Sequence, residues 1–436
     1  MKKCLCYLLM ACLLYSASAQ PPQVNSTPVH PVLKESSPES AGFSSERLTR
    51  LDKMLTDFVD KQYANGTVAM IIRDGKIVYY KAFGYNDINA KKAMQKDAIF
   101  RIASQTKAIT SVAVMMLYEE GKFLLDDPIS NYIPEFKNPV VIDKFNAADS
   151  TYTTVPARRE VTIRDLLTHT SGIGYAQIGS AQQNAIYYKA GVVGGIGVDN
   201  VVLGDKMKIL GKLPLFHQPG ERWTYGLNTD LLGYLVEVLS GMSLDQFFKK
   251  RIFEPLGMKD TYFYLPKEKQ DRLVNLYTED TATKKAVLMT PVRTLNGNFY
   301  RDYPNSNGTY FSGGGGLSST VYDYAVFLQM MLNGGTYNGK RILSRNTVRM
   351  MTMNQIGELS RGVNKFGLGF GITTTAGSAL FPMNEGVFDW GGMFATTYWV
   401  DPKEKLIGLV YRNIFPTSQG SFANRFKVLV YQAIND

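Results

Sequence analysis

Strand-like sequence lies near both ends of this chain, and a long stretch of helical character separates the two regions. Residues 67–83 hold two strand-like runs around Asp74-Gly75, a dipeptide typical of tight β-hairpins. Residues 396–411 hold two more around a polar turn. Strands so far apart in sequence share one sheet only if the middle of the chain leaves that sheet and returns to it. This pattern predicts an α+β fold.

Apolar residues at helical spacing begin after Ser44 and again at Phe422, so a helix is expected at each end of the fold. We therefore predict an antiparallel sheet flanked by N- and C-terminal helices, with an inserted, mostly helical lobe. The sheet lobe is expected at about 41–103 and 300–436, and the helical lobe at about 104–299.

The first residues have the pattern of an export signal. Two lysines precede a short apolar stretch, and a small-residue site at Ala17-Ser-Ala19 follows. We expect a signal peptide at 1–19, a flexible leader at 20–40 and a single domain at 41–436. The protein is then exported and either periplasmic or secreted. No later run of about 18 apolar residues occurs, so no membrane span is expected.

All cysteines lie within this signal, at Cys4, Cys6 and Cys12. The mature chain then has no disulfide, thiol nucleophile or thiolate metal ligand. One alternative is a lipid anchor, because Leu9-Met-Ala-Cys12 is similar to a lipoprotein cleavage box. The three histidines are isolated and the lysines and arginines are dispersed, despite a net charge of +10. We therefore expect no metal, no cofactor and no nucleic-acid partner.

Ser104 and Lys107 are the strongest candidates for chemistry. They lie one helical turn apart, directly after a strand-like segment. A neutral Lys107 amine can take the proton of the Ser104 hydroxyl. If Ser104 opens the helix, its own N–H and the helix dipole also favour the oxyanion that forms. The spacing therefore predicts a serine nucleophile activated by a lysine.

Four further motifs follow Ser104-x-x-Lys107 in order along the chain: Asp165–Gly174, Gln218–Gly233, Ile252–Met258 and Phe388–Met393. With these motifs the chain resembles the serine β-lactamase and penicillin-binding protein superfamily, specifically the branch of class C β-lactamases and β-lactamase-like esterases. The resemblance extends over nearly the whole mature chain.

The resemblance implies a role for a tyrosine. Tyr225 matches the tyrosine of the family's Y-x-N motif and would be a second proton relay beside Lys107. A phenol needs a nearby cation to act as a base at neutral pH, and Lys107 supplies one. The asparagine of that motif would be at Leu227, whereas the chain has Asn228 one place later. Asn228 is retained as a substrate-binding candidate.

The third motif departs from the β-lactamase pattern. The family typically has Lys or His before Thr-Gly, where this chain has Trp390-Gly391-Gly392, a sequence found in esterases of the superfamily. An indole cannot form an ion pair with a substrate carboxylate. The resemblance implies substrate binding by these three residues and an oxyanion hole from the N–H groups of Ser104 and Met393.

The resulting hypothesis is an exported serine hydrolase that forms a covalent acyl-enzyme, most simply an esterase acting on small esters or amides. The alternatives are a class C-like β-lactamase, a D-amino-acid-specific peptidase, and a penicillin-binding sensor that acylates slowly without turnover. His169 is expected in a structural loop turn and not in a Ser-His triad. The glycine-rich stretch Gly191–Gly197 lacks a phosphate-binding lysine and is expected as a mobile surface loop.

Overall fold

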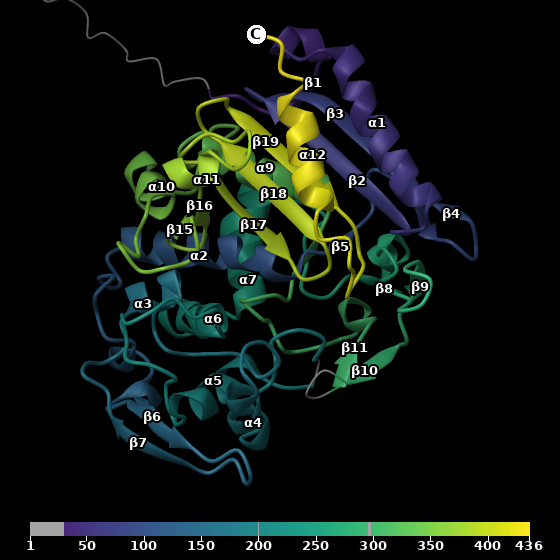
Figure 1. The fold of residues 1–436 in the computed structure, drawn as a ribbon. Helices are drawn as coiled ribbons and strands as arrows, with labels where there is room; N and C mark the ends of the chain where they lie inside the picture. Colours follow the sequence, from purple (N-terminus) through teal and green to yellow (C-terminus); the bar gives the residue numbers. More distant parts are fainter. Residues whose placement is uncertain (1–29, 199, 295–297) are drawn as a thin grey trace, which may run out of the picture.

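The central sheet joins both ends of the chain in the computed structural model, which describes residues 30–198, 200–294 and 298–436 (Figure 1). In the described residues it has nine strands, and all its pairs are antiparallel except β1 with β3. The order is β1 (Lys34–Glu35), β3 (Lys76–Asp87), β2 (Gly66–Arg73), β19 (Leu406–Tyr411), β18 (Thr396–Asp401), β17 (Phe388–Gly392), β16 (Gly371–Ile372) and β15 (Lys365–Phe366), with β4 (Lys92–Ala93) beside β3.

Both predicted hairpins are present. β2 and β3 are joined by Asp74 and Gly75, whose φ angles of 50° and 76° are left-handed, as a two-residue turn between twisted strands requires. β18 and β19 form the second hairpin, and β19 pairs with β2. The sequence-distant hairpins therefore lie side by side, which confirms the predicted α+β class.

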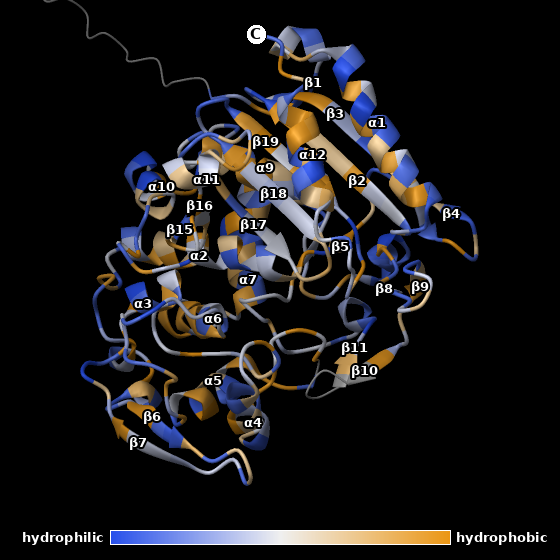
Figure 2. Ribbon diagram, in the orientation of Figure 1, coloured by the Kyte–Doolittle hydropathy of each residue, from blue (hydrophilic) through white to orange (hydrophobic). Residues whose placement is uncertain are grey.

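Helices cover both faces of the sheet. α1 (Ser45–Asp60) and α12 (Phe422–Tyr431) pack on one face, and α2 (Thr106–Glu119) and α9 (Val321–Leu332) cover the other (Figure 1). Successive side chains of β2 alternate between the two cores, so Val68 and Met70 face one cluster and Ala69 and Ile71 the other. Figure 2 shows hydrophobic residues along β19 and a mixed pattern along α1.

The inserted region contains more strands than expected. Its helices are α3 (Ile163–Thr168), α4 (Ala181–Lys189), α5 (Leu203–Gly211), α6 (Asn228–Ser240), α7 (Leu244–Phe248) and α8 (Glu254–Leu256). It also has hairpins of β6 (Val140–Phe145) with β7 (Tyr152–Pro156), β8 (Tyr277–Glu279) with β9 (Ala286–Leu288), and β10 (Val292–Thr294) with β11 (Asn298–Tyr300). β7 is exposed throughout, so it lacks the alternation that reveals a strand in sequence.

The remaining elements complete the sheet-containing lobe. They are β5 (Phe100–Arg101), β12 (Ser318–Ser319), β13 (Thr336–Tyr337), β14 (Lys340–Arg341), α10 (Arg345–Met351) and α11 (Thr375–Ser378). The predicted signal peptide and Cys12 lie outside the described residues. None of the helices in the described part is long and apolar enough to cross a membrane.

The described part of the predicted flexible leader, residues 30–40, includes a short strand that joins the sheet. β1 pairs in parallel with β3, with Lys34 opposite Lys76, and the side chain of Leu33 is buried. The outer edge of β3 offers unpaired backbone groups that a neighbouring segment can pair with whatever its side chains are. Composition alone therefore did not reveal this pairing.

Candidate active site

Ser104 lies where the chain turns from a strand into a helix. β5 pairs with β12, a 3₁₀ turn follows at Ala103–Gln105, and α2 begins at Thr106. Ala103 has a φ of 44°, a left-handed conformation that a residue with a side chain adopts only when its surroundings impose it. Its side chain is fully buried in a small apolar cluster, which holds this turn and directs Ser104 into a cavity.

The three residues predicted to carry the chemistry meet at one oxygen. The Tyr225 hydroxyl donates to Ser104 Oγ at 2.7 Å, and Lys107 Nζ donates to the same oxygen at 3.3 Å. Lys107 Nζ also donates to the Tyr175 hydroxyl oxygen at 2.9 Å and to the Gly314 carbonyl oxygen at 2.6 Å. Ser104 is therefore in contact with two groups able to accept and return a proton.

Tyr175 is a site residue that sequence reasoning missed. It follows the second motif by one position, and its hydroxyl lies against Lys107. Burial, followed by the proximity of Tyr225 and Asp230, raises the pKa of Tyr175 well above its ordinary value. Tyr175 therefore remains a neutral phenol that accepts a hydrogen bond from Lys107.

Aromatic rings hold Tyr225 in place. Its ring stacks on Trp223 at 5.9 Å between centroids and 15° between planes, and it contacts Trp390 at 5.7 Å. Lys107 Nζ lies 4.7 Å from the centroid of the Tyr225 ring, a cation-π distance. The Tyr225 hydroxyl is thus both fixed toward Ser104 and placed beside a positive charge.

His169 and Asn228 lie behind this tyrosine. His169 ends α3 in a left-handed conformation with a φ of 58°, and its Nδ1 lies 2.9 Å from the Asn228 side-chain amide. Burial, with the charges of Lys107 and Arg361, lowers the pKa of His169 well below its ordinary value. Asn228 is fully buried, accepts a hydrogen bond from Ser171 and does not line the cavity. In this geometry both residues join α3 to α6.

The cavity at Ser104 has a volume of about 730 Å³. Its walls combine aromatic and aliphatic side chains with a few polar groups. They comprise Ser104, Tyr175, Gln177, Ile178, Gly194, Gly195, Ile196, Tyr225, Asp230, Phe299, Ser312, Gly314, Trp390, Gly391, Met393 and Phe415.

β17 brings most of the third motif to this cavity. Trp390, Gly391 and Met393 line it, and Gly391 borders open space where a Cβ atom would meet only the Thr396 carbonyl. Gly392 does not line the cavity, because it packs against the Ile102 carbonyl where any Cβ atom would collide. Gly392 therefore allows β17 to dock beside the turn that carries Ser104.

A cation does accompany the third motif, although the sequence placed none there. The Arg361 guanidinium lies 5.0 Å from the Trp390 ring centroid and 5.3 Å from those of Trp223 and Phe366. Burial lowers the pKa of Arg361 below its ordinary value. Arg361 lies behind the indole and does not line the cavity.

The glycine-rich stretch 191–197 forms part of the cavity wall, which its prediction as a surface loop did not include. A Cβ atom at Gly194 would collide with the Gln177 side chain, and one at Gly197 would collide with Phe299. These glycines permit close packing of the backbone against the cavity walls.

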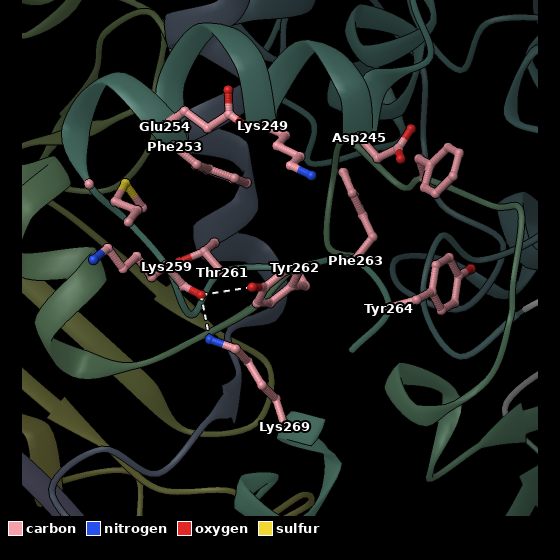
Figure 3. Close-up of a pocket in the computed structure, with 13 residues that line it drawn as sticks. Asp245, Lys249, Phe253, Glu254, Lys259, Thr261, Tyr262, Phe263, Tyr264 and Lys269 are labelled. Atoms are coloured by element: carbon pink, nitrogen blue, oxygen red, sulfur yellow. Dashed lines mark hydrogen bonds between the residues drawn. The ribbon is translucent and has the colours of Figure 1, made fainter. Parts of the chain in front are cut away.

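A second cavity of about 470 Å³ lies under α7 and the π-helical turn Lys249–Phe253 (Figure 3). Phe253, Phe263 and Tyr264 form apolar walls there. Its Lys269 forms an ion pair with Asp260 at 2.5 Å. No residue lines both cavities, so the second is separate from the Ser104 site.

Comparison with known proteins identifies the family. The Beta-lactamase family model matches residues 51–432. A candidate D-alanyl-D-alanine carboxypeptidase of Escherichia coli K12 is 30% identical over 423 residues, 92% of this chain and 88% of that protein. Esterase EstB of Burkholderia gladioli is 29% identical over 365 residues, 81% of this chain and 86% of that protein.

A solved structure has the same fold. EstCE1, described as a hydrolase with promiscuous acyltransferase activity, aligns with a TM-score of 0.75 at 25% identity, over 89% of this chain and 98% of that one. The family match extends over the sheet, the inserted lobe and the residues that meet at Ser104. This chain therefore belongs to the β-lactamase family and is a serine hydrolase of that family.

Proposed function

We propose that the protein is an esterase that hydrolyses small, uncharged carboxylic esters through an acyl-enzyme on Ser104. The observation that carries this proposal is the 2.7 Å hydrogen bond from the Tyr225 hydroxyl to Ser104 Oγ, beside buried Lys107, in a cavity with mainly apolar walls. Such a cavity favours an acyl group without charge.

The reaction proceeds in two steps. Ser104 Oγ attacks the ester carbonyl while its proton passes to the Tyr225 and Lys107 relay, and the backbone N–H groups of Ser104 and Met393 hold the oxyanion. The tetrahedral intermediate collapses, the C–O bond to the alcohol breaks, and the relay returns the proton to the departing alkoxide. Water then attacks the acyl-enzyme, loses a proton to the same relay, and releases the acid and the Ser104 hydroxyl.

The third motif supports esters over β-lactams and peptide termini. Trp390 stands where a substrate carboxylate would meet a cation, and Arg361 lies behind the indole ring. The name of the similar EstB also describes an esterase. The carboxypeptidase name of the Escherichia coli relative makes a D-amino-acid-specific peptidase the alternative to test.

One panel of substrates separates these functions. The purified mature protein is assayed with p-nitrophenyl acetate and butyrate, a chromogenic cephalosporin and a D-Ala-D-Ala peptide, with Ser104→Ala as control. We expect ester turnover that Ser104→Ala abolishes. Dominant cephalosporin or peptide hydrolysis would overturn the esterase proposal. Persistent labelling by a fluorescent penicillin without turnover would instead indicate a sensor.

We also propose that the protein is exported. The lysines, apolar stretch and Ala17-Ser-Ala19 site at the beginning of the chain support this. Cell fractionation and mass spectrometry of the mature N-terminus test it. Gln20 as the first residue is expected. A lipidated Cys12 would show the membrane-anchored alternative, and an intact Met1 in the cytoplasm would contradict export.

A further inference from the structure

Asp230 is a buried carboxylate at the Ser104 cavity that the mechanism above leaves without a role. It lies in the first turn of α6, its side chain is fully buried, and Ser312 Oγ donates to its Oδ1 at 2.6 Å. Burial raises the pKa of the Asp230 carboxyl above its ordinary value, while Ser312, the charge of Lys107 and the Gly314 N–H oppose that rise. A buried carboxylate is costly unless its neighbours compensate the charge, so these neighbours are informative.

Gly314 lies between this carboxylate and the active-site lysine. Its carbonyl oxygen accepts a hydrogen bond from Lys107 Nζ at 2.6 Å. A Cβ atom built on Gly314 would collide with Asp230 Oδ2 and would lie 3.5 Å from Lys107 Nζ. The Gly314 peptide is therefore held between a carboxylate and an amine, and a side chain there would disturb both.

The Asp230 carboxylate lies in the wall of the cavity, together with Ser312. A Cβ atom on Gly195 would lie 3.3 Å from Ser312 Oγ and 3.4 Å from each Asp230 carboxylate oxygen, so the Gly195 backbone packs close to both groups. Asp230 is thus close to the reacting residues and is placed to act through them.

We propose that Asp230 is a positioning residue of the esterase site: it holds the Ser312–Gly314 turn, whose carbonyl anchors the Lys107 amine beside Ser104, and it supplies the counter-charge for the protonated lysine. This inference rests on the esterase function proposed above. Lys107 contacts no carboxylate directly in the described part of the chain, so Asp230 acts through the Gly314 peptide and through space.

The charged and titratable groups around this carboxylate come from several elements. Lys107 faces the Asp230 carboxylate from α2, and Tyr175 and Tyr310 face it from loops. The charge of Asp230 contributes to the raised pKa values of these two tyrosines. Tyr225 and His169 in turn lie near the lysine. A change of charge at this one carboxylate is therefore expected to alter the pH dependence of the reaction.

Asp230→Asn in the full mature chain tests the charge. The variant keeps an oxygen that can accept from Ser312. With p-nitrophenyl butyrate from pH 5 to 10, we expect kcat to fall about 30-fold, with KM within about twofold of wild type. We also expect the acidic limb of the kcat profile to move about one pH unit lower, because loss of a negative charge makes the proton relay easier to deprotonate.

Two variants separate position from charge. Ser312→Ala keeps the carboxylate but loosens the turn, so we expect kcat to fall about threefold with the acidic limb unmoved. Asp230→Glu keeps the charge, so its limb is expected at the wild-type pH despite a lower kcat. If Asp230→Asn does not fold, the Asp230→Glu variant is the test of the proposal. An acidic limb of its kcat profile at a pH other than that of the wild type would overturn the proposal.

The failures are distinguishable. Wild-type kcat and an unmoved limb in folded Asp230→Asn would overturn the role of Asp230, and so would lower kcat without movement of the limb. Failure of the wild-type enzyme both to hydrolyse the ester and to react at Ser104 with a fluorophosphonate would instead reject the esterase function.

Discussion

The Ser104 cavity and the second cavity described above differ in the groups that contact a nearby lysine amine. Beside the Ser104 cavity, Lys107 is only 2% exposed and donates to three uncharged oxygens of residues in the cavity wall. In the second cavity, the Lys269 amine forms an ion pair with Asp260. It also donates a hydrogen bond to the Lys259 carbonyl (Figure 3). A cation neutralised by a carboxylate in contact has little tendency to exchange protons with a hydroxyl. The comparison shows that the reactive site is identified by the arrangement of polar groups around a cavity and not by the presence of a cavity alone.

Removing the lysine that contacts Ser104 is expected to have the largest effect. Lys107→Met keeps much of the side-chain volume but loses the proton relay, so we expect kcat/KM for p-nitrophenyl butyrate to fall about 10³-fold. The matched control is Lys249→Met in the second cavity, which we expect to remain within about twofold of wild type. Equal losses in both variants would break the distinction between the cavities.

The tyrosine is expected to matter less than the lysine. Tyr225→Phe keeps the stacking on Trp223 but loses the hydroxyl that donates to Ser104, and we expect kcat to fall about 10²-fold with KM nearly unchanged. Tyr262→Phe, on the wall of the second cavity, is the control and should retain full activity. A Tyr225→Phe enzyme with wild-type kcat would remove Tyr225 from the relay.

The sequence predicted the local parts of this site better than the distant ones. Ser104 and Lys107 share one helical turn, and Asp74-Gly75 determines its own hairpin, so short-range rules suffice for both. Tyr175 and Arg361 reach the site only through tertiary packing. Their types are common in any chain, and nothing in their spacing points to Ser104 before the fold is known.

The same limit applies to the third motif. The sequence indicates that Trp390-Gly391-Gly392 lacks a cation. It does not indicate which glycine faces the cavity, because that depends on how β17 lies against its neighbours: Gly391 lines the cavity, and Gly392 packs on Ile102. Asn228 illustrates the reverse case. The motif suggests contact with substrate, whereas its amide is occupied by His169 and Ser171.

Restoring a cation at the third motif tests why the reactive cavity favours esters. Trp390→Lys removes an indole that packs against Tyr225 and adds a charge near Arg361, so we expect ester kcat/KM to fall about tenfold. Acylation by a carboxylate-bearing cephalosporin should rise by a similar factor. Trp390→Phe controls for the lost indole. If cephalosporin acylation does not rise in Trp390→Lys, the missing cation does not explain the substrate preference.

The smallest expected effect concerns stability beneath the second cavity. Asp323 on α9 accepts hydrogen bonds from the Asp260 N–H at 2.7 Å and the Thr261 hydroxyl at 2.9 Å. Burial raises the pKa of the Asp323 carboxyl to about 6. The folded protein then holds this proton more tightly than the unfolded chain does. The stabilisation is fully present below the unfolded pKa and is lost as the pH rises through about 6.

Urea unfolding at pH 5 and pH 7 measures this contribution. From pH 5 to pH 7, we expect Asp323 to lower the free energy of unfolding of the wild-type protein by about 1 kcal/mol. Asp323→Asn should remove that loss, because the amide oxygen can accept both hydrogen bonds and carries no charge. Asp205→Asn, at an exposed carboxylate on α5, should leave the wild-type difference unchanged. Esterase activity should be unaffected in both variants, since a proton under the second cavity influences folding and not the reaction at Ser104. An equal pH dependence in wild type and Asp323→Asn would show that Asp323 does not titrate in this interval.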